Sequence, residues 1–146
     1  MSKLIGNQSF ETASHSCYRL TYHVVWCIKF RRHILNALQR DFVIEALNHA
    51  ATEIKCKIIE ANGEADHLHF ILDAPPTICI SDTIGKLKSK TASAFLDRFG
   101  SVFYGNHKRT LWSSGFFVAS TGGVTLEVLK HYVQNQGSDA PNPPST

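Results

Sequence analysis

The chain has 146 residues, 43% of them hydrophobic, which is enough to bury the core of one compact domain. The formal net charge of +3 is mildly basic, so the charge permits a polyanionic partner without requiring one. The four cysteines form no C-x-x-C pair, and no apolar run is long enough for a signal peptide or a membrane span. We therefore expect a cytoplasmic protein with no membrane partner, and neither a zinc ribbon nor a redox pair.

Both ends of the chain are predicted to be flexible. Residues 1–16 are polar and show no periodic pattern. Residues 137–146 contain three prolines and no apolar side chain larger than alanine. The single folded domain is therefore predicted to span residues 17–136.

The first two elements of this domain are predicted from the spacing of its apolar residues. Apolar and polar residues alternate over residues 17–30, which predicts a long strand with one buried face. Apolar residues then recur at steps of three and four from about Asn36 to Lys55, which predicts an amphipathic helix.

Two further strands and a second helix follow. Residues 56–61 and 67–72 have strand composition, and the Asn62-Gly63 pair between them predicts a turn. Ser81 can cap a helix whose apolar stripe continues to Phe99.

The last part of the domain completes the fold prediction. Residues 111–120 predict one or two strands, and residues 125–136 predict a closing helix that ends before Gly137. The order strand, helix, strand, strand, helix, strand predicts an α+β fold. Its antiparallel sheet has the split βαβ arrangement of ferredoxin-like folds, followed by a C-terminal helix.

A pair of histidines lies in the strand predicted over residues 67–72. Residues two apart share a face of a strand, so His67 and His69 point the same way while Leu68 and Phe70 point toward the helices. Two imidazoles one pleat apart can bind a single cation. The motif is weak alone, however, and two ordinary sheet histidines are the alternative.

A tyrosine and a glutamine lie four residues apart on the closing helix. Tyr132 is placed on the flank of the apolar stripe, and Gln136 lies on the same side of the helix. The amide oxygen of Gln136 could complete a metal site while the phenol of Tyr132 attacks a substrate. A half-buried tyrosine with only a packing role is the alternative.

Five segments in this order resemble a known family. They are YHVVWCIKFRR, DHLHFIL, SDTIGKLKS, LWSSGFFV and LEVLKHYVQNQ. Together they resemble the HUH single-tyrosine transposases of the 200/605 insertion-sequence family, and the resemblance extends from about Tyr18 to Gln136. The combination is much more specific than any one segment.

The resemblance implies an activity and a site. Such proteins excise and insert mobile DNA as single strands, and they recognise small hairpins near the ends of the element. By this resemblance Tyr132 is the nucleophile, His67 and His69 bind a divalent ion, Mg²⁺ or Mn²⁺, and Gln136 is the third ligand. The resemblance also implies a homodimer in which the tyrosine helix of one subunit completes the histidine site of the other.

Basic side chains cluster in three segments, residues 29–33, 85–90 and 107–109, and five from the first two are candidates for contact with DNA. The candidates are Arg31, Arg32, Lys86, Lys88 and Lys90. Solvated surface charges are the alternative for each of them.

Three other functions remain open at this point. One is a non-catalytic nucleic-acid-binding module of ferredoxin-like fold. A second is a small metal-dependent hydrolase that acts through activated water. A third is a domesticated relative of the transposases that processes repeated extragenic hairpins.

Overall fold

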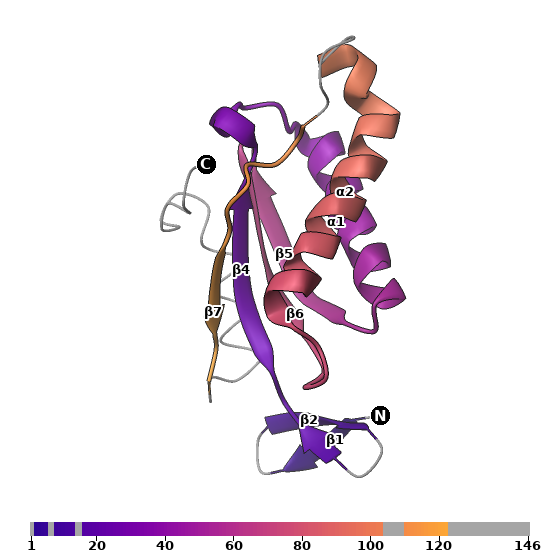
Figure 1. Cartoon of the computed structure of the whole chain (residues 1–146), viewed down its shortest axis with the longest axis vertical. Coiled ribbons are helices and arrows are strands. Elements are labelled where there is room, and N and C mark those ends of the chain that lie inside the picture. The colour runs from indigo at the N-terminus through magenta and orange to yellow at the C-terminus, as the bar shows by residue number, and fades with distance from the viewer. Residues whose placement is uncertain (1, 6–7, 14–15, 104–109, 123–146) are drawn as a thin grey trace.

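The computed structural model describes residues 2–5, 8–13, 16–103 and 110–122, and the structural statements below concern these residues. They form two antiparallel sheets and two long helices (Figure 1). The smaller sheet has three strands, β1 (Ser2–Ile5), β2 (Gln8–Ala13) and β3 (Ser16–Tyr18).

The larger sheet has four strands in the order β5-β6-β4-β7, and each neighbouring pair is antiparallel. The strands are β4 (Thr21–Cys27), β5 (Lys57–Glu64), β6 (His67–Asp73) and β7 (Phe117–Ser120). The strands β4 and β5 follow one another in the chain but are not neighbours in the sheet, because β6 lies between them. This confirms the predicted α+β fold with a ferredoxin-like split βαβ sheet.

Both helices cover the same face of this sheet, as Figure 1 shows. They are α1 (Ala37–Glu53) and α2 (Ile80–Phe103). The core between helices and sheet uses alternate residues of the two central strands, whose side chains point toward the helices. They include Val24 and Trp26 of β4 and Leu68, Phe70 and Leu72 of β6, packed against Val43, Leu47, Ile84, Leu87 and Phe95.

The start of α1 is fixed by reciprocal hydrogen bonds. The side chain of Asn36 accepts from the backbone N–H of Gln39, and the side chain of Gln39 accepts from the backbone N–H of Asn36, both at 2.9 Å. This capping box satisfies two donors that a helix otherwise leaves unpaired at its N-terminus. The helix therefore begins where the sequence predicts it.

The predicted turn at Asn62-Gly63 is wrong. Both residues lie inside β5, where Asn62 pairs with His69 and Gly63 with Leu68, and the chain turns at residues 65 and 66 instead. Strand pairing over the whole length of β6 outweighs the local turn preference of the dipeptide. Glycine is still required at position 63, because a Cβ there would lie 2.9 Å from the carbonyl oxygen of His67.

The region predicted as a single strand over residues 17–30 is divided in the structure. β3 ends at Tyr18 and β4 begins at Thr21, and after β4 a short 3-10 turn, η1 (Lys29–Arg31), changes the chain direction. The strands β1 and β2 were also not predicted, because residues 1–16 show no alternating pattern. The proposed domain limits and the flexibility of the two ends stay predictions.

The closing helix predicted over residues 125–136, and with it the C-terminal tail, lies outside the described residues. No helix in the described part of the chain is both long and apolar enough to cross a membrane.

A buried hydrogen bond between α2 and the segment before β7 provides a test of this packing. The indole Nε1–H of Trp112 donates to Oγ1 of Thr91 at 3.0 Å, and Thr91 is fully buried. Thr91→Val keeps the side-chain volume but leaves the indole donor unpaired, so we expect the free energy of unfolding to fall by about 1–3 kcal/mol. Urea denaturation of the purified variant measures this change.

The matched control is the same substitution in a Trp112→Phe background, where no indole donor exists. There Thr91→Val should have a much smaller effect on unfolding. Equal losses in both backgrounds would show that the hydrogen bond contributes nothing to stability.

Candidate active site

The histidine pair lies at the start of β6, on the face of the sheet away from α1 and α2. The strand register places His67 opposite Cys27 of β4 and His69 opposite Val25. The alternate residues Leu68, Phe70 and Leu72 point into the core covered by the helices, as the alternation of the strand predicts.

The two imidazoles are close, nearly parallel and shielded from solvent. Their ring centroids are 5.5 Å apart with an interplanar angle of 25°. His67 is 6% exposed and His69 is 0% exposed. Nε2 of His67 and both ring nitrogens of His69 have no hydrogen-bond partner within the described residues. Buried polar atoms are normally paired, so these nitrogens mark a place where a further ligand fits.

Asp66 orients the first histidine. Its Oδ1 lies 2.8 Å from Nδ1 of His67. A ring N–H at Nδ1 donating to this carboxylate leaves the lone pair on Nε2, the nitrogen without a partner. A carboxylate behind a histidine in this way is the usual outer partner of a metal-binding imidazole. Asp66 was not predicted from the sequence to have a role, although it directly precedes the histidine pair.

Asp66 also holds the end of β4. The guanidinium of Arg31 donates to Oδ2 of Asp66 through Nη2 at 3.1 Å and through Nε at 3.2 Å. Burial opposes the charge of Asp66, but the hydrogen bond from His67 and the Arg31 guanidinium together hold the pKa of this carboxyl below its usual value. The carboxylate therefore stays ionised and remains an acceptor for both partners.

Burial also keeps the second histidine neutral. It lowers the pKa of His69 to about 4, and the neighbouring His67 and His23 add to the effect. A neutral imidazole is the form that binds a metal. His23, on the same sheet face, has its ring centroid 6.3 Å from that of His69 in an edge-on arrangement, and burial lowers its pKa as well. The alternation of β4 could have identified His23, because its position has the same parity as Val25 and Cys27.

Two histidines alone do not complete a metal site. Within the described residues, no group of three or more His, Cys, Asp or Glu side chains could hold a metal ion. The predicted third ligand, Gln136, and the predicted nucleophile, Tyr132, lie beyond residue 122 and therefore outside the described residues. Their roles stay predictions.

The five predicted DNA-binding residues have different surroundings in the structure. Arg31 is paired with Asp66, and Lys90 is paired with Glu53 at 3.0 Å. Lys86 is exposed on α2, while the Cζ atom of Arg32 lies 5.8 Å from the centre of the Phe30 ring. DNA contact by these residues stays a prediction.

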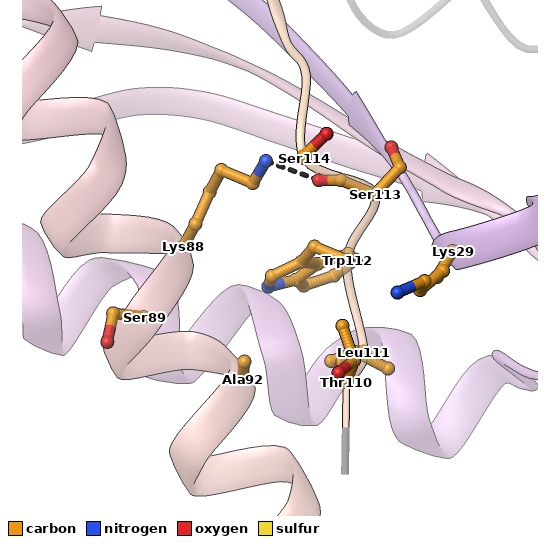
Figure 2. Close-up of a pocket in the computed structure, with 9 residues that line it drawn as sticks. All are labelled: Lys29, Lys88, Ser89, Ala92, Thr110, Leu111, Trp112, Ser113 and Ser114. Carbon is orange, nitrogen blue, oxygen red and sulfur yellow. Dashed lines mark hydrogen bonds between the residues drawn. The ribbon is translucent and has the colours of Figure 1, made fainter. Parts of the chain in front are cut away.

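Lys88 has a structural environment that the sequence did not indicate. Figure 2 shows its side chain extending from α2 toward Ser113. Lys88 and Trp112 both line a cavity of about 380 Å³. The ammonium of Lys88 donates to the backbone carbonyls of Ser113 and of Gly115, the latter at 2.9 Å. Burial lowers the pKa of Lys88. The side chain thus ties α2 to the segment that leads into β7.

Comparison with known proteins identifies similar sequences over most of the chain. The family model described as "Transposase IS200 like" matches residues 16–136. The transposase for insertion sequence element IS200 from Salmonella typhimurium is 28% identical over 126 residues, which are 86% of this chain and 82% of that protein. The ISDra2 transposase TnpA from Deinococcus radiodurans is 24% identical over 119 residues, covering 82% of this chain and 85% of that protein.

Two solved structures are similar in fold. A putative transposase from Deinococcus radiodurans R1 has a TM-score of 0.70 at 24% identity, over 87% of this chain and 98% of that chain. A REP-associated tyrosine transposase bound to a REP hairpin has a TM-score of 0.55 at 17% identity, over 84% of this chain and 68% of that chain.

The position of Lys88 generates a prediction about its contribution to stability. Lys88→Met retains much of the side-chain packing but removes the donor to two carbonyls. We expect the free energy of unfolding to fall by about 1–3 kcal/mol, measured by urea denaturation. Lys86→Met, on the exposed face of the same helix, should leave stability within about 0.5 kcal/mol of the unmodified protein. Equal stability of the two variants would contradict the structural role.

Proposed function

This chain belongs to the IS200-like transposase family, and we propose that it cleaves and rejoins single-stranded DNA through a covalent bond between DNA and Tyr132. The observation that carries the proposal is the buried histidine pair, with its unpaired ring nitrogens and the carboxylate of Asp66 behind it. The family match extends through residue 136, so it includes both the histidines and the proposed nucleophile.

His67 and His69, together with Gln136, would hold a divalent ion, Mg²⁺ or Mn²⁺. The two histidines and Asp66 fit such an ion, because burial keeps His69 neutral and Asp66 leaves Nε2 of His67 as the free ring nitrogen. When bound, the ion would neutralise negative charge on the non-bridging oxygens of the phosphate under attack.

Tyr132 would supply the nucleophile. Its phenol oxygen forms a bond to the phosphorus while one ester bond between phosphorus and a deoxyribose oxygen breaks, and the proton of the phenol passes to the departing oxygen. The bond energy is retained in the tyrosyl phosphate, so a deoxyribose hydroxyl can later reverse the step without ATP. A phenol has a reference pKa near 10, and a nearby positive charge would favour the reactive phenolate.

The natural substrate is proposed to be single-stranded DNA that carries a hairpin. One structure of similar fold is a tyrosine transposase bound to a REP hairpin, which supports this substrate class for the fold. We further propose a homodimer in which Tyr132 and Gln136 of one subunit complete the histidine pair of the other. This arrangement would supply the ligand that the described residues of one subunit lack.

A covalent-trapping experiment tests the proposed reaction. Palindromes are first sought in the DNA on either side of the coding region. Single-stranded oligonucleotides with these sequences are then incubated with protein and Mg²⁺ or Mn²⁺, and adducts are resolved on a denaturing gel. We expect a metal-dependent adduct that disappears completely in Tyr132→Phe, because phenylalanine has no attacking oxygen. Tyr22→Phe, on the helix-covered side of β4, is the matched control and should retain the adduct.

Each alternative function has its own result in this experiment. Binding without any adduct in the unmodified protein would favour the non-catalytic module. Cleavage that persists in Tyr132→Phe would favour a hydrolase with an activated water. Adducts only on repeated extragenic hairpins, and none on flanking palindromes, would favour the domesticated relative.

Asp66 generates a second prediction about the metal. Asp66→Ala removes the acceptor that fixes the orientation and tautomer of His67, so we expect Mn²⁺ affinity to fall about 10- to 100-fold. Isothermal titration of the purified protein with Mn²⁺ measures the change. Asp41→Ala removes an exposed carboxylate of α1 and serves as the control. Unchanged affinity in Asp66→Ala would show that His67 needs no support, or that the ion binds elsewhere.

A further inference from the structure

Phe30 is displayed to solvent in an unusual backbone conformation. It is 79% exposed, one of two large hydrophobic side chains exposed in the described part of the chain. Its backbone lies in the left-handed region with φ 61° and ψ 15°, and the next residue, Arg31, has φ 51°. Residues other than glycine rarely adopt this backbone conformation, and residues held in it are concentrated at binding sites and active sites.

The strained turn is fixed by the strands around it. The backbone N–H of Lys29 donates to the carbonyl of Leu111, and the N–H of Arg31 donates to the carbonyl of Ile28, both at 2.8 Å. The Arg31 side chain is in turn held by Asp66. The same residues that hold the turn therefore leave the Phe30 ring outside the core.

The turn lies at the histidine end of the sheet. Cys27, the last residue of β4, pairs with His67, and the N–H of Ile28 donates to the carbonyl of Asp66 at 2.8 Å. Phe30 follows Cys27 by only three residues. Figure 1 shows η1 just after the end of β4.

Two cationic side chains lie near the ring of Phe30. The Nζ atom of Lys29 lies 5.5 Å from the ring centre, and the Cζ atom of Arg32 lies 5.8 Å from it. An exposed aromatic ring next to cations is the combination that binds single-stranded nucleic acids, since a base stacks on the ring while the cations attract the phosphates. A protein partner would require a wider apolar patch, whereas the neighbours of Phe30 in the segment KFRRH are basic.

We propose that Phe30, with Lys29 and Arg32, is a stacking site for one unpaired base of the DNA strand next to the histidine pair. The inference rests on the proposed function in so far as that strand is the one cleaved. Stacking of one base would hold the strand in register, so that the neighbouring phosphate lies near His67 and His69. Phe30 is thus a positioning residue for the substrate.

The experiment uses hairpin oligonucleotides with the sequences of any palindromes found beside the coding region, each with a single-stranded extension of about ten nucleotides. The fluorescent base 2-aminopurine replaces each base of the extension in turn. We expect quenching at one position with the unmodified protein and with Phe30→Trp, and no quenching with Phe30→Leu. The affinity of Phe30→Leu should fall roughly 5- to 100-fold, as for loss of one stacked base. Leu38→Ala, the other exposed hydrophobic position, should change neither signal.

Three outcomes decide the proposal. Unchanged quenching and affinity in Phe30→Leu, with normal covalent trapping, would overturn the stacking site while leaving the proposed reaction intact. A change in subunit association of Phe30→Leu by size-exclusion chromatography, with DNA binding unchanged, would also overturn it and would place the ring in a protein interface. Quenching that depends on Phe30 in a protein that forms no adduct would support the stacking site and refute the proposed reaction.

Discussion

The pleat of β6 is the constraint on which both the core and the candidate site depend. In one strand of seven residues, Leu68, Phe70 and Leu72 pack against the helices while His67 and His69 lie on the opposite face. A shift of the register by one residue would put the imidazoles into the apolar core and the apolar side chains on the other face. The burial that stabilises the fold therefore also fixes the direction of the histidines.

Asp66 links this strand to the end of β4. Its carbonyl accepts from Ile28, and its carboxylate binds both Arg31 and His67. The charge of Arg31 favours the ionised carboxylate, and the ionised carboxylate in turn fixes the ring of His67. Arg31, a candidate for DNA contact by sequence, thus has a structural partner directly beside the histidine pair.

The sequence predicted the features that depend on local periodicity. The two faces of β6 and the two long helices follow from spacing that is visible in one segment at a time, and the split βαβ sheet follows from the order of elements along the chain. The turn was misplaced because pairing of Asn62 and Gly63 with β6 is a property of two segments together. For the same reason neither the tether of Lys88 to the carbonyls near β7 nor the left-handed backbone of Phe30 could be predicted. Tyr132 and Gln136 rest on the resemblance and the family match alone.

The two imidazoles of His67 and His69 bear on the order in which the proposed metal site would be assembled. Two imidazoles give a divalent ion only two ligands, and Mg²⁺ in particular prefers oxygen ligands in an octahedral arrangement. An amide oxygen from another helix and a phosphate oxygen from the substrate would add ligands of the preferred kind. Metal affinity and DNA affinity are then thermodynamically linked, since each ligand that joins the ion strengthens the binding of the others. The sheet alone would therefore bind the ion weakly, and the site would become complete only when the DNA strand and the tyrosine helix are both in place.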